Sequence, residues 1–368
     1  MSKIEYKDIM AFHPGYYIKE IIEDMEMTQC EFAKRLDTTD KTLSKLLSGQ
    51  ISLSLEIAKK LSQMLGTSVD MWLNLQKKYN EKYCEIEQMK ELDKEVECLN
   101  CIKYKYFSDL NVVPSTRDKK EQVKNLRKYL CVSELSVLSR PDLLAACRTA
   151  VSEVELKNVI NANAWIQTGI NFAKGENCSL FSKKKLEGFL PEIRGMTIQN
   201  PIEFYGRLKK IFSECGVAFV VLPYLTNSGI NGAVKWLSND KVMLLMNDRR
   251  KYADTFWFAL FHEIKHILQE MKKDVYISID DTRKNLTLGL NDEKSESEAD
   301  LFACEYLIPG EKYQRFLLDE DYTSTDAVKK FAESIGVHPS IVVGRLQHDK
   351  KIAWNSSLVE LKIKYVIS

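Results

Sequence analysis

Residues suited to binding a transition metal are few in this chain. It has only five histidines, and its nine cysteines are an odd number scattered along the sequence. Such a set does not form a disulfide framework and favours reduced thiols, as in the cytoplasm. Cys98 and Cys101 form a CxxC pair with no second pair nearby, and zinc needs about four ligands. We therefore interpret this pair as structural or incidental.

The chain also lacks an excess of either charge and any long apolar run. Its 53 lysines and arginines balance 52 aspartates and glutamates, which leaves a net charge of +1. Nucleic-acid binding must therefore come from a local face of the molecule. Residues 1–30 hold no apolar stretch long enough for a signal peptide, and no segment approaches membrane-spanning length. These absences predict a cytoplasmic protein without a membrane partner.

Glycine and proline are sparse as well, at 15 and 8 residues, whereas 45% of the 368 residues are hydrophobic. A chain of this length and composition can form two or three packed domains. We predict three, covering residues 1–80, 81–190 and 191–368.

The first predicted domain shows short helices joined by tight turns. The HPG sequence at 13–15 opens one helix, and Thr28 with Glu31 has the pattern of a capping box for a second. Thr39 can cap a third helix, which the SG sequence at 48–49 ends. Two short helices with a tight turn, the second with a polar outward face, form a helix-turn-helix motif. The apolar face of the third helix, expected to be buried, consists of Leu43, Leu46 and Leu47.

Residues 13–79, from HPGYYIKEII through the WLNL sequence at 72–75, resemble the XRE helix-turn-helix family and specifically its HigA-type antitoxin branch. The resemblance implies an all-α, lambda-repressor-like domain that binds a double-stranded DNA operator, and it implies a toxin as protein partner. It further implies that Gln29 contacts phosphate and that the third helix faces the major groove. The implied DNA-binding residues are Gln29, Thr39, Asp40, Lys41, Thr42, Ser44 and Lys45.

The local charge of this motif is weak, because residues 28–50 hold four basic and three acidic side chains. A homodimer would compensate by doubling the phosphate contacts. A helical protein-interaction module remains the alternative for this domain.

After Trp72 we expect a charged helix with an apolar stripe at steps of three and four. The stripe either docks on a neighbouring domain or forms a dimer contact. Residues 105–190 are mostly helical in pattern and hold no cluster of reactive side chains, so we predict a helical spacer. The stripe consists of Tyr79, Tyr83, Ile86, Met89, Leu92, Val96 and Leu99.

From about residue 195 the pattern changes to mixed α/β. Residues 203–214 predict a helix, 216–222 and 242–247 predict buried strands, and 229–232 predict a loop. Residues 254–270, DTFWFALFHEIKHILQE, predict a strongly apolar helix that carries an HExxH motif.

The HExxH spacing is typical of a zinc site. His262 and His266 are four residues apart, so one helix face can present both imidazoles to one Zn²⁺ ion, with Glu263 as general base. A catalytic zinc usually has three protein ligands, and Glu296 can be the third. Asp300 lies on the same helix face as Glu296 and can orient a ligating histidine. Glu298 is the alternative third ligand.

The HExxH motif, the ESEAD sequence at 296–300 and the LIP sequence at 307–309 resemble the ImmA/IrrE metallopeptidase family over about residues 200–350. The resemblance implies an α+β zincin-like domain that cleaves partner repressors. Lys265 stands where many relatives have glycine, which predicts a crowded or altered cleft. Tyr306 and His338 are weak candidates for stabilising an oxyanion, and a structural role is favoured for each. Residues 327–346 also predict helix, turn and helix, either as a packing element or as a second DNA contact.

The sequence thus predicts an antitoxin-like DNA-binding transcriptional regulator with a zinc peptidase domain that cleaves a protein partner or itself. The alternative is a non-catalytic repressor whose metallopeptidase-like domain is a sensor or a partner-binding surface. A general housekeeping peptidase localised by its first domain is the third hypothesis.

Overall fold

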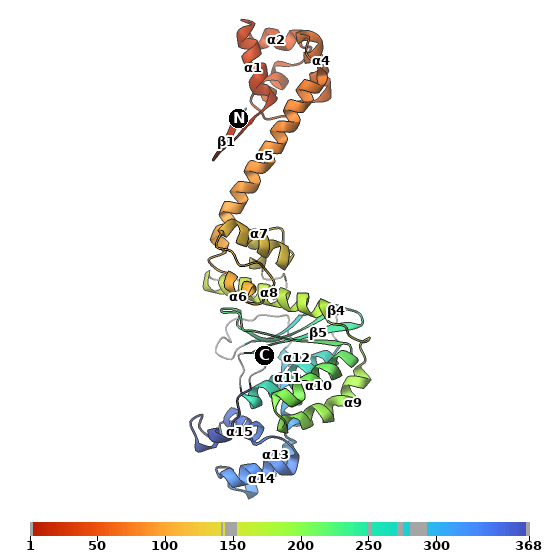
Figure 1. Ribbon diagram of the computed structural model, residues 1–368, viewed down its shortest axis with the longest axis vertical. Helices are drawn as coiled ribbons and strands as arrows, with labels where there is room; N and C mark the ends of the chain where they lie inside the picture. Colours follow the sequence, from red (N-terminus) through yellow and green to blue (C-terminus); the bar gives the residue numbers. More distant parts are fainter. Residues whose placement is uncertain are drawn as a thin grey trace. The chain divides into compact units, whose positions relative to one another are not determined.

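The computed structural model (Figure 1) describes residues 3–140, 143, 153–248, 252–270, 275–279 and 293–365. They form two compact units, Met1–Glu97 and Cys98–Ser368. The predicted fold class is confirmed, since an all-helical helix-turn-helix region is followed by further helices and then by a domain of sheet and helices. None of the described helices is long and apolar enough to cross a membrane.

The first unit contains the predicted helices α1 (Pro14–Asp24), α2 (Gln29–Arg35), α3 (Asp40–Leu47) and α5 (Val69–Cys98). It also contains α4 (Leu55–Leu65), which we did not predict. The Thr28 hydroxyl accepts the N–H of Glu31 at 3.2 Å and starts α2, whereas the Glu31 carboxylate pairs with Arg35 at 2.7 Å instead of closing the predicted capping box. Apolar side chains from each of these helices form one core, which includes Ile18, Phe32, Leu43, Leu61 and Trp72.

A β-hairpin that we did not predict precedes α1. Its strands β1 (Lys3–Tyr6) and β2 (Ile9–Phe12) pair antiparallel. The Tyr6 hydroxyl donates to Asp93 of α5 at 2.7 Å, and the Lys90 amine lies 5.7 Å from the Tyr6 ring centroid. The hairpin therefore contacts the second half of α5, the part that carries the apolar stripe. The sequence signal for it was weak, because β1 alternates polar and apolar residues over only four positions and β2, IMAF, does not alternate at all.

The second unit has a four-stranded sheet in the order β3-β5-β4-β6, made of β3 (Val217–Leu222), β4 (Ile230–Ser238), β5 (Lys241–Asn247) and β6 (Val275–Ile279). β3 runs parallel to β5, while β4 runs antiparallel to both β5 and β6. The prediction of a loop at 229–232 was wrong for residues 230–232, because β4 begins at Ile230. Asparagine and glycine are poor strand residues, but pairing with β5 and β6 on both sides overrides that preference.

Helices cover both faces of this sheet (Figure 1). Helix α8 (Glu153–Gly175) lies on one face, and α10 (Pro201–Glu214) and α11 (Ala253–Leu268) lie on the other. Trp165 of α8 and Tyr106 of α6 (Tyr104–Asp109) both donate to the Pro223 carbonyl just after β3, at 3.1 and 2.8 Å. Part of the predicted spacer thus packs on the sheet. The three-domain division stays a prediction, and its first boundary falls within α5.

The remaining described elements surround this sandwich. Helices α7 (Lys119–Leu130) and η1 (Leu135–Ser139) lie beside α8, and α9 (Lys183–Gly195) with η2 (Met196–Ile198) leads into α10. The C-terminal part contains α12 (Glu293–Leu307), α13 (Gly310–Asp319), α14 (Thr325–Ile335), α15 (Pro339–His348) and η4 (Ser357–Leu361). Residues of α14 and α15 belong to the same core as those of α11, which supports packing as the role of 327–346.

Arg194 at the end of α9 fixes α12 in this core. Its guanidinium donates to the backbone carbonyls of Tyr306 at 2.7 Å and Leu307 at 3.0 Å, and to that of Ile335 at 2.7 Å. The last carbonyls of a helix have no partner within the helix, so one arginine here satisfies the ends of both α12 and α14. Because α12 also carries Glu296 and Asp300, Arg194 helps to position the candidate site.

Candidate metal centre

The HExxH motif lies on α11, the most apolar helix of the second unit. Nearly every side chain around the motif is buried, and the motif residues are themselves 5% (His262), 0% (Glu263) and 1% (His266) exposed. Polar groups at such depth must be paired with each other or with a ligand. The buried His262, Glu263 and His266 are therefore expected to be paired with groups of opposite charge or with a bound cation.

Three side chains from α11 and α12 converge there. The Nε2 atoms of His262 and His266 lie 3.0 Å apart, and the two carboxylate oxygens of Glu296 lie 3.3 Å from His262 Nε2 and 3.1 Å from His266 Nε2. One ligand atom from each of the three lies within 4.8 Å of the others. The structure thus brings together the three metal ligands proposed from the sequence.

The pKa values of these groups show that the cluster stabilises a positive charge. Burial alone lowers the pKa of His262, but hydrogen bonds to Asp300 and Glu296 and the charge of Glu263 outweigh it and raise the pKa to about 10. Burial alone raises the pKa of Glu296, but its hydrogen bonds to the two histidines lower it to about 2.

This cluster fits a divalent cation. Zinc bonds of about 2.0–2.2 Å in tetrahedral geometry separate neighbouring ligand atoms by about 3.3–3.6 Å. The distances of 3.0–3.3 Å found here are close to that range. Two imidazole nitrogens and a carboxylate form the usual protein ligand set of a catalytic zinc, with a fourth position left open. The donor set and its spacing are therefore those that zinc prefers.

Asp300 and Glu263 flank the three candidate ligands. Asp300 Oδ1 lies 2.8 Å from His262 Nδ1, where it can hold the imidazole with Nε2 turned toward His266. Glu263 lies against β4, since a Cβ added to Gly232 would sit 2.5 Å from Glu263 Oε1. The glycine in the strand therefore makes room for the Glu263 carboxylate.

Gln269 is a neighbour of the site that the sequence analysis missed. Its amide oxygen lies 3.2 Å from His266 Nδ1 and accepts a hydrogen bond from Ser295 at 2.8 Å, and its amide nitrogen donates to Glu298 at 3.3 Å. Glu298, our alternative ligand, thus contacts Gln269, and it is Glu296 that meets both histidines. The pattern that could have predicted Gln269 is its position three residues after His266, on the same side of the helix.

The other residues considered from the sequence occupy structural positions. The Lys265 amine lies 5.6 Å from the centroid of the Phe302 ring. The Tyr306 ring stacks against Phe261 at 5.3 Å, and His338 caps α15 by accepting the N–H of Ser340 at 3.1 Å.

The implied DNA-binding residues lie at the surface of the first unit. Thr42 is the exception, being partly buried, with its hydroxyl 2.9 Å from that of Thr39 and its backbone N–H donated to Thr39 Oγ1. The two threonines thus build the N-terminus of α3. The exposed members of the set are Gln29, Thr39, Asp40, Lys41, Ser44 and Lys45.

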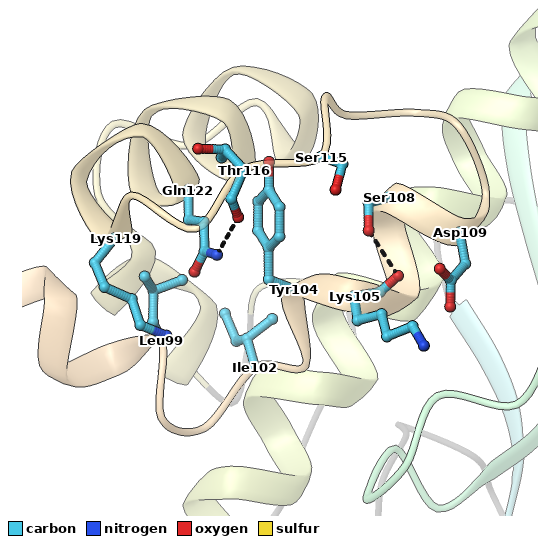
Figure 2. A pocket seen from close by; sticks show the side chains of 10 residues that line it. All are labelled: Leu99, Ile102, Tyr104, Lys105, Ser108, Asp109, Ser115, Thr116, Lys119 and Gln122. Carbon is cyan, nitrogen blue, oxygen red and sulfur yellow. Dashed lines mark hydrogen bonds between the residues drawn. The ribbon is translucent and has the colours of Figure 1, made fainter.

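A pocket of about 390 Å³ lies elsewhere in the second unit (Figure 2). It is lined by residues of α6 and α7 and of the segments that precede each of them. Gln122 on its wall donates to the Thr116 carbonyl at 2.7 Å. The Tyr104 hydroxyl donates to the Pro114 carbonyl at 2.6 Å. The lining includes none of the α11 and α12 side chains described above, so the candidate metal centre and this pocket are separate features.

Two family models match separate parts of the chain. A helix-turn-helix model matches residues 18–72, and the model of the IrrE N-terminal-like domain, of peptidase family M78, matches residues 230–347. The first covers α2 and α3, and the second covers β4, α11 and α12. The two matches therefore fall on the two regions that carry the candidate DNA-binding and metal-binding residues.

Similar proteins are found for the N-terminal region. An uncharacterized HTH-type transcriptional regulator of Escherichia coli, YddM, is 36% identical over 89 residues, which are 23% of this chain and 95% of that protein. Virulence-associated protein A′ of Dichelobacter nodosus is 38% identical over 69 residues, 18% of this chain and 60% of that protein. Through this region the chain belongs to the helix-turn-helix family of transcriptional regulators.

Solved structures similar to this chain carry antidote titles. A putative antidote protein of a plasmid maintenance system from Nostoc punctiforme is 31% identical, covering 23% of this chain and 92% of that one, with a TM-score of 0.22. An addiction module antidote protein of a HigA family from Coxiella burnetii is 28% identical, covering 23% and 91%, with a TM-score of 0.21.

Proposed function

We propose that this chain is a transcriptional regulator that binds a DNA operator through α3 and carries a zinc-dependent peptidase in its second unit. The observation that supports the peptidase most directly is the convergence of His262, His266 and Glu296 at 3.0–3.3 Å beside the buried Glu263. The peptidase would cleave a protein partner or the chain itself.

The roles of the residues follow from their chemistry. His262, His266 and Glu296 would hold the ion, and Asp300 would orient His262. Bound zinc supplies a Lewis acid that makes a water acidic near neutral pH and polarises a peptide carbonyl. Glu263 takes the proton from the attacking water and transfers it to the leaving amine.

The test of this proposal pairs metal analysis with Glu263→Gln. Elemental analysis of the purified full chain is expected to find about one zinc per molecule, and Glu263→Gln is expected to keep that zinc and the affinity for DNA. Mass spectrometry of protein N-termini in cells expressing either form is expected to find new termini with the wild type alone. Identical termini would overturn cleavage and leave the non-catalytic alternative, a metal-holding sensor or partner-binding surface.

Several partner assignments belong to the same proposal. The resemblance of residues 13–79 to HigA-type antitoxins supports a small toxin as protein partner, a homodimer on the operator and a location in the cytoplasm. Light scattering of the full chain with and without operator DNA tests the dimer. A mass of one chain without DNA, and of one chain plus one operator with it, would reject the dimer.

A further inference from the structure

The two histidines of the candidate metal centre have different hydrogen-bond partners at their Nδ1 atoms, on the side of the ring away from the candidate metal position. The Nδ1 atom of His262 faces the Asp300 carboxylate at 2.8 Å, and the Nδ1 atom of His266 faces the Gln269 amide at 3.2 Å. A carboxylate can only accept a hydrogen bond, whereas a carboxamide can accept or donate. The tautomer of His266 therefore depends on which end of the Gln269 amide faces it.

Glu298 decides the orientation of that amide. One end of the amide lies 3.3 Å from Glu298 Oε2, and the other end lies close to both His266 Nδ1 and the Ser295 hydroxyl. If the oxygen faced Glu298, two acceptors would oppose each other next to a negative charge. The nitrogen must therefore face Glu298, which leaves the oxygen to accept from Ser295 at 2.8 Å and from His266.

We propose that Gln269 is a positioning residue for the metal centre. With its amide oxygen as the acceptor, His266 carries its proton on Nδ1 and presents the lone pair of Nε2 to the point where His262 and Glu296 converge. Ser295 is 5% exposed and holds the amide from the other side. Gln269, held by Ser295 and Glu298, thus fixes the tautomer and the ring orientation of His266. The carboxylate of Asp300 fixes those of His262.

Gln269 also links the two helices of the site. It is the C-cap of α11, one residue beyond the helix, while Ser295 and Glu298 lie in the first turns of α12. The same side chain that orients His266 therefore holds the start of α12, where Glu296 lies between its two partners. This inference rests on the proposed metal centre and is independent of whether a peptide is cut.

The test uses the full chain and measures zinc affinity by competition with a chromophoric chelator. Gln269→Met keeps the length of the side chain and removes the acceptor, and it is expected to weaken zinc binding about 10–100-fold. Gln269→Glu combined with Glu298→Gln restores an acceptor for His266 without placing two carboxylates against each other, and is expected to recover most of the affinity. Glu270→Ala changes the exposed neighbouring residue, whose carboxylate lies 3.7 Å from the Lys183 amine, and is expected to leave affinity unchanged.

A second readout separates positioning from general loosening of the fold. Nitrogen-15 NMR of the zinc-loaded wild type is expected to find His266 protonated on Nδ1, and the visible spectrum of the Co²⁺ form is expected to change in Gln269→Met but not in Glu270→Ala. Wild-type affinity in Gln269→Met, or a His266 protonated on Nε2, would overturn this inference. A wild type that binds no zinc would overturn the metal centre itself, so the two failures are distinguishable.

Discussion

Most of the polar side chains of α3 are exposed to solvent, whereas those of the HExxH motif on α11 are buried. On α3 the side chains of Asp40, Lys41, Ser44 and Lys45 are exposed, and the leucines face the core. On α11 the apolar and the reactive residues share one buried environment, where His266 is 1% exposed. The comparison shows two ways of placing chemistry on a helix, on its solvated face or within its packed face.

The two arrangements differ in what they require of the fold. Exposed polar groups remain hydrated, so α3 packs through its leucines whatever its outer face carries. Buried groups lose their water, and on α11 only mutual pairing or a bound cation compensates for that loss. Substitutions of the exposed polar residues of α3 should therefore alter binding alone, whereas substitutions of the buried polar residues of α11 should alter binding and stability together.

The largest expected effect is on the metal centre. His262→Ala or Glu296→Ala removes one of three ligands, so we expect zinc to fall from about one per chain to near zero. A ligand that binds only the folded state stabilises it, by about 4 kcal/mol at a thousandfold excess over its Kd. The thermal stabilisation of the second unit by added zinc should therefore disappear. Elemental analysis and calorimetry measure both, and retained zinc in both variants would contradict the assigned ligands.

A substitution of Gly232 tests whether the buried Glu263 carboxylate restricts which residue the neighbouring strand β4 can carry. A Cβ at this position would lie 2.5 Å from Glu263 Oε1, so Gly232→Ala must displace that carboxylate. We expect the free energy of unfolding to fall by about 1–3 kcal/mol, as for other overpacked cores.

The matched control is Gly206→Ala in the middle of α10, where the added Cβ meets nothing within 4 Å. Alanine has the higher helix propensity, so this variant should gain up to about 1 kcal/mol. Urea denaturation of both variants measures the difference, and an equal effect of the two substitutions would show that Gly232 is not needed beside Glu263.

Lys45→Ala is expected to act on binding alone. If Lys45 contacts DNA, the variant should bind operator more weakly, and the slope of log K against log salt should shrink by about 1. The melting temperature should stay unchanged because the side chain is exposed. Lys77→Ala, an exposed lysine on α5, serves as the control, and equal losses in the two variants would argue against α3 as the DNA-binding helix.

The smallest expected effect concerns a histidine that caps a helix, a feature found in each unit. His13 and His338 each precede a proline and cap a helix, accepting the N–H of Gly15 at 3.0 Å and of Ser340 at 3.1 Å. Burial lowers the pKa of both histidines below 6.5. The unfolded chain therefore binds protons more readily, and the stability that each cap contributes is complete above about pH 6.5 and is lost as the pH falls below it.

His13→Asn isolates this effect, because asparagine caps helices without titrating. Between pH 7.5 and 5.5 the wild type should lose about 1 kcal/mol or less that the variant retains. Unfolding of the first unit followed in urea at the two pH values measures this loss, and equal pH dependence in both proteins would show that His13 is not the titrating cap.

Most short-range features of the molecule could be predicted. The helices α1 to α3, the Thr28 and Thr39 caps, β3, β5 and α11 followed from spacing and from capping residues, because the interactions that form them lie within a few residues. The placement of Glu296 and Asp300 was anticipated from their spacing of four. The hairpin and β4 were not predicted, because a strand is stable only through its pairing with another strand.

The sequence by itself determined the helix-turn-helix and the spacing of the HExxH residues, since both depend on neighbours along one helix. Tertiary structure decided that α8 covers the sheet, that Glu296 rather than Glu298 meets both histidines, and that Gln269 lies behind His266. Those outcomes depend on how α11, α12 and the sheet pack, and the packing is the result of burial shared among many distant residues. The distances within the metal centre therefore belong to the folded core and cannot be obtained from any one segment.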